Sequence, residues 1–374
     1  MKLGLSGGLA LALVSLPCLA QSPAGNVTLY GAIDTGVEYI THASASGGSG
    51  VRMPTLTGGQ LPSRWGLRGN EDLGNGWRGI FNLESGFFAD SGSSGQAGRL
   101  FGRTAIVGVE GPWGSFTLGR QSTMLAWSLM DADVIGPSVF SMASFDSYIP
   151  NARADNSLAY RGRFGGLTVG ATYSLGRDTS AAGNCGGERP GDAQACRGWS
   201  GLLKYDGGGW GVAAVIDEQR GGPGAAPAVV VPGVAGVAIA SSDSRDRRYM
   251  ANGYLHIADL KLGAGWMHRR IEGSAADVST NLYFVGATYP IGSWTLNAQA
   301  TRMIANAYQA KGTMLVGRAS YSFSKRTAAY AMLAHMGNSG AGAVFSVSSS
   351  SIVPWSPKAG QGQMGVMVGL RHSF

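Results

Sequence analysis

The chain has 374 residues, of which only 14% are charged, 44% are hydrophobic and 61 are glycine. Soluble surfaces normally carry about 25–35% charged residues, so the composition argues against an ordinary soluble protein. The net charge of +7 is compatible with nucleic acid, an acidic membrane surface or anionic solutes as partners. The arginines are scattered singly instead of forming a tail, so no nucleic-acid partner is expected.

The first twenty residues have the pattern of a secretory signal peptide. Lys2 supplies a short positive region, residues 3–16 form a small apolar stretch, and Gln21 is the expected mature start. The stretch is shorter than the ~20 residues that a spanning helix needs, so a transmembrane anchor is disfavoured. Lipid attachment at Cys18 is disfavoured because Pro17 fits that processing poorly. We therefore expect a signal peptide over residues 1–20 and one mature domain over residues 21–374.

No later segment has the pattern of a membrane-spanning helix. The longest apolar stretch, residues 225–240, is interrupted by Pro227 and Pro232 and is too short. A chain that enters a membrane without helices must close into a barrel, because every backbone polar group needs a partner there. The role of residues 225–240 is not apparent from the sequence.

The dominant repeat is an alternation of apolar and polar residues over about ten positions, followed by a turn. Residues 166–176 place Leu167 and Val169 on one face and Thr168 and Thr172 on the other. Short connections such as 165–166 alternate with long ones such as 219–246, the outer-membrane pattern. These features predict an all-β fold, a 16-stranded antiparallel transmembrane β-barrel. The sixteen segments begin near Val27, Ser63, Trp77, Arg99, Ser115, Ser157, Leu167, Trp199, Trp210, Arg247, Leu260, Thr280, Ser293, Thr313, Thr327 and Gln363.

Aromatic residues gather near the ends of these segments, as Trp77, Trp210 and Trp294 illustrate. Amphipathic rings favour the two interfaces of a bilayer. The alternative, a soluble β-sandwich, would have too many apolar faces to bury.

Two cysteines remain after removal of the leader, Cys185 and Cys196, in one polar, glycine-rich segment. An even count in an exported protein predicts a disulfide. Free thiols or a metal pair are the alternatives, but no histidine or further cysteine lies close by in the sequence.

Motifs for catalysis or cofactor binding are weak. Residues 74–79, GNGWRG, fit the dinucleotide pattern GxGxxG, but alternation typical of a strand follows where a helix is required. The five histidines are dispersed and make no metal spacing. We therefore expect no cofactor, no metal and no catalytic residue, although an enzyme barrel with a Ser–His pair remains an open alternative.

The arginines carry the strongest functional signal. If Trp65 and Leu67 face lipid, then Arg64 and Arg68 face the lumen, and the same parity applies to three further segments. On the fourth segment we expect Leu100 and Ile106 to point outward. A wall of fixed positive charge in a narrow pore favours anions. The expected basic lining comprises Arg64, Arg68, Arg78, Arg99, Arg103, Arg161 and Arg163. Alternatively, these arginines only solvate the lumen and pair with Asp34 and Glu84.

The connection at residues 122–156 is too long for a simple turn. Folded into the lumen, it would narrow the pore and set carboxylates opposite the arginines; an exposed outer loop is the alternative. The expected acidic lining comprises Asp34, Glu84, Asp131, Asp133 and Asp146.

Several stretches resemble the general trimeric porins of β-proteobacteria, the Gram-negative porin family. They run from VTLYG at 27–31 and SRWGLRGNEDLGNG at 63–76 through FNLESGF at 81–87, RLFGR at 99–103, TLGRQ at 117–121 and RADNSLAY at 153–160. The chain closes with VGLRHSF at 368–374. The resemblance extends from end to end and is densest before residue 175.

The resemblance implies a sixteen-stranded homotrimer whose third outer loop folds inward. It further implies a constriction containing arginines that match Arg64, Arg78 and the Arg161 region. The family's inner loop usually carries a Pro-Glu-Phe-Gly-like turn, whereas residues 136–140 here read GPSVF. Losing that carboxylate would shift selectivity further toward anions.

We therefore expect an outer-membrane porin for passive diffusion of small hydrophilic solutes and ions, with anion preference. A solute-specific channel, an enzyme barrel and an adhesive surface are the alternatives. Expected partners are outer-membrane lipid, lipopolysaccharide and the barrel-assembly machinery. Phe374, after the outward-facing Val366, Val368 and Leu370, resembles the signal which that machinery reads.

Overall fold

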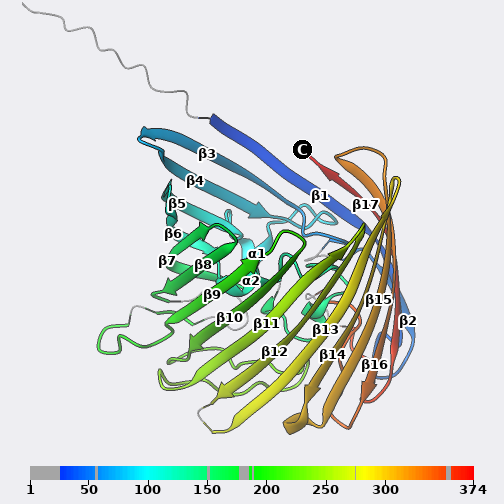
Figure 1. Cartoon of the computed structure of the whole chain (residues 1–374). Coiled ribbons are helices and arrows are strands. Elements are labelled where there is room, and N and C mark those ends of the chain that lie inside the picture. The colour runs from blue at the N-terminus through cyan, green and yellow to red at the C-terminus, as the bar shows by residue number, and fades with distance from the viewer. Residues whose placement is uncertain are drawn as a thin grey trace, which may run out of the picture.

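The computed structural model describes residues 26–54, 58–149, 152–176, 185–187, 189–273, 275–350 and 355–374. Sixteen long antiparallel strands close into a barrel, as predicted, and two short helices accompany them (Figure 1). Among the described residues, no helix combines the length and apolarity needed to cross a bilayer. The expected signal peptide, residues 1–20, lies outside the described residues.

The strand boundaries follow the predicted segments closely, with the largest shifts at β5 and β7. The strands are β1 (Asn26–Thr41), β2 (Ser49–Arg52), β3 (Arg64–Gly74), β4 (Trp77–Gly86), β5 (Thr104–Gly111), β6 (Gly114–Ser122), β7 (Arg153–Phe164), β8 (Leu167–Ser174), β9 (Gly198–Asp206), β10 (Trp210–Arg220), β11 (Arg245–Ile257), β12 (Leu260–Glu272), β13 (Asp277–Ile291), β14 (Trp294–Ala305), β15 (Ala310–Ser322), β16 (Thr327–Ser339) and β17 (Gln363–Ser373). The helices are α1 (Gly95–Gly98) and α2 (Met124–Leu129), with 3-10 turns at Met142–Ser144 and Asn306–Tyr308.

The first strand, β1, closes the barrel. Along one edge, residues 32–40 of β1 pair with β17, and along the other edge residues 26–32 pair with β3. The unpredicted short strand β2 pairs with residues 38–41 of β1. Between these two pairings, backbone N–H groups of Gly59, Gln60 and Leu61 donate to the carboxylate of Asp34. The segment before β3 thus packs against β1 between its pairings with β2 and with β3, where no strand pairs with this edge of β1.

Alternate strand positions are exposed and apolar, as the period of two predicts. On β17, Val366, Val368 and Leu370 are exposed on one face, and Phe374 follows them on the chain. Exposed aromatic residues such as Trp113 and Trp294 lie at or beside the strand ends. This face is the outer wall of the barrel.

The inner face of β11–β17 carries a large apolar patch beside its charged residues, whereas the simple alternation model expected a polar lumen. Large side chains from successive strands form one buried cluster there: Met250, Met267, Leu282, Met303, Met314, Met332 and Met367. The reason is that long connections pack against this face. Phe140 and Phe145, from the connection after β6, and Phe345, from the connection after β16, belong to the same cluster.

The apolar segment at 225–240 belongs to this cluster too. Val230, Val231 and Ile239 are at most 2% exposed, and Arg269 on β12 donates to the backbone oxygen of Val229. The segment is therefore a packing element inside the molecule, which explains its composition.

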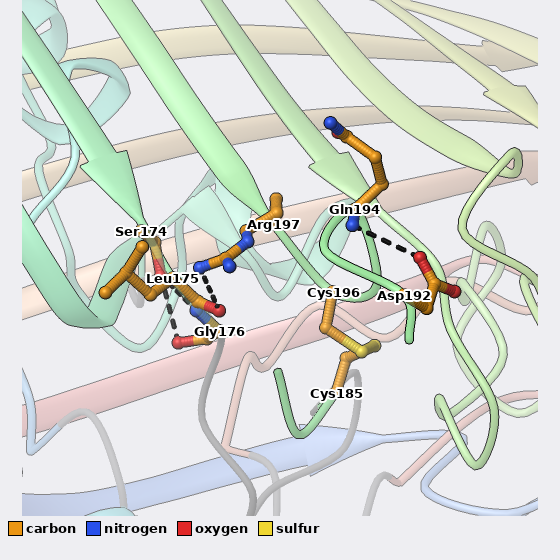
Figure 2. Close-up of a disulfide and its surroundings, with 8 residues drawn as sticks. All are labelled: Ser174, Leu175, Gly176, Cys185, Asp192, Gln194, Cys196 and Arg197. Carbon is orange, nitrogen blue, oxygen red and sulfur yellow. Dashed lines mark hydrogen bonds between the residues drawn. A yellow bond between two sulfur atoms is a disulfide. The ribbon is translucent and has the colours of Figure 1, made fainter. Parts of the chain in front are cut away.

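A disulfide joins Cys185 and Cys196 in the connection between β8 and β9 (Figure 2). Both residues are buried, and the Cys196 N–H donates to the oxygen of Gly221, which follows β10. Near the bond, Arg197 donates to the oxygen of Leu175 at 2.8 Å. The disulfide thus closes a small loop within one connection, and the Cys196–Gly221 hydrogen bond joins that loop to the neighbouring connection after β10.

Candidate functional site

A cavity of about 900 Å³ lies between strands β3–β7 and the connection after β6. Positive charge prevails around it, because six arginines and three carboxylates contribute to the lining. These residues are Arg64, Arg68, Arg78, Arg103, Arg153 and Arg161, with Glu84, Glu110 and Asp133.

Glu84 is shared between two of these arginines. The Arg103 Nε atom lies 2.6 Å from Glu84 Oε1, and the Arg64 Nε atom lies 3.5 Å from Glu84 Oε2. The Tyr30 hydroxyl donates to the same carboxylate at 3.1 Å. One carboxylate therefore holds two guanidinium groups in place and leaves one positive charge in excess.

The remaining arginines of the wall differ in their partners. Arg78 forms an ion pair of 2.6 Å with Glu110. The Arg161 guanidinium lies 3.5 Å from the centre of the Trp127 ring on α2, and that of Arg68 lies 5.1 Å from the Tyr30 ring. Within the described residues neither Arg68 nor Arg161 has an ion pair. A cation over an aromatic face keeps its full charge, so both can attract an anion.

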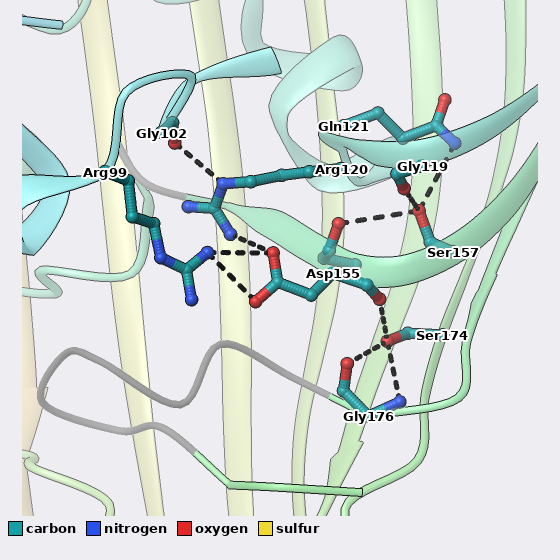
Figure 3. A network of polar contacts seen from close by, with 10 residues as sticks. Arg99, Gly102, Gly119, Arg120, Gln121, Asp155, Ser157, Ser174 and Gly176 are labelled. Atoms are coloured by element: carbon teal, nitrogen blue, oxygen red, sulfur yellow. Dashed lines mark hydrogen bonds and ion pairs between the residues drawn. The ribbon is translucent and has the colours of Figure 1, made fainter. Parts of the chain in front are cut away.

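Two arginines of the expected lining lie elsewhere. Arg99 donates to both carboxylate oxygens of Asp155 at 3.0 Å, and Arg120 donates to the same group at 2.6 Å (Figure 3). Arg163 is exposed where β7 ends, and donates to the backbone oxygen of Gly165. The expectation is wrong for Arg99, because β5 begins only at Thr104 and strand parity does not apply before it.

Strand parity is also wrong for Ile106. Ile106 lines the cavity together with Glu110 on β5, whereas Val107 and Val109 are exposed on the outer face. Because β5 has apolar residues on both faces, its alternation does not show which face points outward. The prediction took Leu100 as an outward-facing reference, and this gave Ile106 the wrong face.

The five expected acidic residues are distributed among three environments. Glu84 and Asp133 line the cavity. Asp131 pairs with Lys204 of β9 at 2.6 Å. Asp34 and Asp146 are buried, at 0% and 4% exposure, and are anchors instead of lining residues. Asp34 was expected in the lumen from parity alone, which cannot foresee that the chain before β3 covers it.

Asp133 closes a turn within the connection. Its Oδ1 atom accepts from the backbone N–H groups of Ile135 at 3.2 Å and Gly136 at 3.0 Å. Burial raises the pKa of Asp133, although these hydrogen bonds act in the opposite direction. Asp133 therefore sets a carboxylate beside the GPSVF turn that carries none of its own.

Asp146 anchors the same connection to the far wall. Its carboxylate accepts from Arg248 Nε at 2.8 Å, and Arg248 also lies 3.2 Å from Asp246. Burial by itself would raise the pKa of Asp146, but Arg248 and Arg269 bring that pKa below its usual value. The pair is nearly inaccessible to water, so it holds the chain in place and does not meet solutes.

Several residues of the site were missed from the sequence. Arg153 and Glu110 line the cavity, and they lie on β7 and β5, the two strands whose first residues were misjudged. Arg248 and Arg269 look like ordinary strand arginines, and only the fold reveals their partners.

A closed antiparallel barrel with an apolar outer face and a charged inner cavity defines a β-barrel channel of the outer membrane. The family model described as Gram-negative porin matches residues 8–341. The chain belongs to this family, and it is an outer-membrane channel for passive diffusion. The family comprises channels and not enzymes, which answers the open alternative of an enzyme barrel.

Individual relatives agree with this assignment. The outer membrane porin protein 32 of Delftia acidovorans is 29% identical, over 97% of this chain and 99% of its own. An outer membrane porin protein of Bordetella pertussis is 31% identical, over 76% of this chain and 81% of its own. Among solved structures, the anion-selective porin from Comamonas acidovorans superimposes with a TM-score of 0.77 at 26% identity, covering 94% of this chain and 100% of its own. OmpT of Vibrio cholerae in its trimer form, at 16% identity and a TM-score of 0.67, shares the fold.

Proposed function

We propose that the arginine-lined cavity is the constriction of the channel and that it makes the channel prefer anions. The observation that carries this proposal is the excess of six arginines over three carboxylates around one cavity. Fixed guanidinium groups lower the energy of a passing anion in a confined space. The similarity to a porin whose title calls it anion-selective supports the same direction.

We further propose that residues 123–149 are a third outer connection folded into the barrel. Four contacts support this. The Val134 N–H donates to Gln299 of β14 at 3.2 Å, and Arg318 of β15 donates to the Ile135 oxygen at 2.9 Å. Asp131 and Asp146 pair with Lys204 and Arg248, on the inner faces of β9 and β11. Contacts to four strands between β9 and β15 would hold the segment against the inner wall opposite the cavity.

The remaining proposals concern export and assembly. Residues 1–20 act as a cleaved signal peptide, and residues 21–374 form the mature domain. OmpT of Vibrio cholerae, which shares the fold, has a trimer form, and we infer a homotrimer for this chain as well. The barrel-assembly machinery and lipopolysaccharide are its proposed partners during and after insertion.

The reversal potential in planar bilayers under a salt gradient tests the selectivity. Each exchange of arginine for glutamate lowers the net charge of the cavity by two. We therefore expect Arg161→Glu to weaken anion preference and the double variant Arg68→Glu/Arg161→Glu to reverse it, because three excess positive charges become one excess negative charge. Neither residue has an ion pair within the described chain, which limits damage to folding.

Arg163→Glu is the matched control, because it makes the same charge change at an exposed arginine of the same strand, β7, outside the cavity. Its reversal potential should equal that of the unmodified protein. Cation preference of the unmodified channel, or an unchanged potential in the double variant, would overturn the proposal.

A further inference from the structure

An apolar groove of about 920 Å³ crosses the outer face of the barrel over β9–β15. Its size falls within the range of clefts that hold small ligands, about 300–1,000 Å³. The groove faces away from the lumen, because its exposed residues include Leu203, Tyr205 and Val285 of the outer wall. In an outer-membrane protein this face meets lipid.

Strand register explains the groove. Ala214, Ala251 and Trp266 are direct cross-strand partners on β10, β11 and β12. The next outward row contains Ala264 and Ala300, which flank Val285. The small side chains in the middle of these two rows leave a depression in the outer surface, and larger rings such as that of Trp266 project at its edge.

The groove runs diagonally from one membrane boundary to the other. Tyr205 lies one residue before the end of β9 and its short turn. Arg302 lies three residues before the end of β14, at the end of the barrel that bears the long connections. In outer-membrane barrels the long connections are extracellular, so the groove ends with Arg302 in the outer leaflet.

Positive charge marks that extracellular end. Arg302 is exposed on the outer face, and its Nη1 atom donates to Thr313 Oγ1 at 2.7 Å, which orients the guanidinium. Lys311 is exposed on the same face of β15, two residues before Thr313. Within the described residues neither cation has an ion pair. Charge facing lipid is costly near the bilayer midplane and requires either the interface or an anionic partner.

We propose that this groove binds a phosphorylated, multiply acylated glycolipid of the outer leaflet, the lipid A part of lipopolysaccharide. Acyl chains fill the groove over Ala251 and Ala264, and a phosphate binds Arg302 and Lys311. Guanidinium groups match phosphate geometry, and basic clusters beside membrane-spanning elements bind anionic lipid headgroups. The inference rests on the lipopolysaccharide partnership proposed above, to which it assigns a site, and is independent of the proposed selectivity.

Native mass spectrometry of the full-length protein, titrated with purified lipid A or with phosphatidylethanolamine, tests this site. We expect lipid A to bind more tightly than the zwitterionic lipid. Arg302→Gln should weaken lipid A binding about tenfold, as the loss of a charge-assisted hydrogen bond does. Ala251→Trp, which fills the groove, should weaken it without removing a charge.

Two controls match these variants. Arg163→Gln removes an exposed arginine from β7, far along the barrel wall, and Ala331→Trp adds a ring to the exposed face of β16 outside the groove. Both should bind lipid A like the unmodified protein. Arg302→Gln should also keep normal conductance, which separates this site from the channel proposal.

Equal binding of lipid A and phosphatidylethanolamine would overturn the proposal, and so would unchanged lipid A binding in Arg302→Gln. An altered oligomeric state of Ala251→Trp with unaltered lipid binding would assign the groove to a second copy of the chain and equally overturn it.

Discussion

Phe374 and Gly31 exchange two backbone hydrogen bonds, each 3.1 Å long, at the seam where the last strand meets the first. The missing side chain of Gly31 leaves room for the Phe374 ring, because a Cβ atom there would overlap the ring. The terminal residue therefore closes the barrel through its backbone and covers the seam with its side chain.

This relationship predicts that Phe374→Ala impairs assembly more than conduction. The backbone bonds can still form, but the seam loses its ring and the terminal aromatic of the assembly signal. We expect a lower yield of folded, heat-modifiable barrel in outer-membrane fractions, while the channels that do form keep their conductance. Leu370→Ala, which shortens another exposed side chain of β17, is the control. Normal insertion of Phe374→Ala would contradict the assembly role.

Selectivity should depend on pH through Asp133. Its raised pKa means that it loses its charge at a pH above the ordinary value near 3.9. One of three carboxylates of the cavity then becomes neutral, so anion preference should increase as the pH is lowered from neutral through the raised pKa of Asp133. Reversal potentials over this range measure the effect. Asp133→Asn should show the low-pH preference already at neutral pH, and a titration curve identical to that of the unmodified channel would refute the assignment.

The buried pair of Asp146 and Arg248 should stabilise the barrel. Removing one partner of a buried ion pair costs about 3–5 kcal/mol, so Asp146→Asn should lower the free energy of unfolding by an amount near this range in urea titrations with lipid vesicles. Asp277→Asn is the control, because Asp277 is 62% exposed and its distant pairing with Arg270 is worth at most about 1 kcal/mol.

The pH dependence of this pair has a definite sign. The pKa of Asp146 is lowered in the folded protein, so its stabilisation is complete above the ordinary pKa near 3.9 and is lost as the pH falls through the lower folded value. Acidification below about pH 4 should therefore destabilise the unmodified protein more than Asp146→Asn. Parallel stability curves would contradict this.

The apolar segment at 225–240 should limit conductance by filling part of the barrel. Replacing residues 226–238 with two glycines removes Val230 and Val231 from the buried cluster. We expect a larger single-channel conductance and a weaker ion preference, because solutes gain a path away from the arginines. Deleting the exposed loop tip at 44–47 should change neither. An unchanged conductance after the larger replacement would show that the segment lies outside the conducting path.

The sequence by itself determined the barrel. A period of two, interrupted by alternately short and long connections, predicts the strand number and the outer face, because lipid imposes one rule on every outward position. For the same reason parity identified four lining arginines on strands that alternate cleanly, Arg64, Arg68, Arg78 and Arg161.

Only the tertiary structure decided what happens inside. Asp34 has the strand parity of a lining residue, yet the chain before β3 covers it. Arg99 lies close to lining residues in the sequence, yet it is paired with Asp155. The apolar inner face around Met267 likewise depends on long connections that pack against it. The environment of an inward-facing residue depends on contacts between segments that are far apart in the chain. A local pattern of alternation carries no information about these contacts.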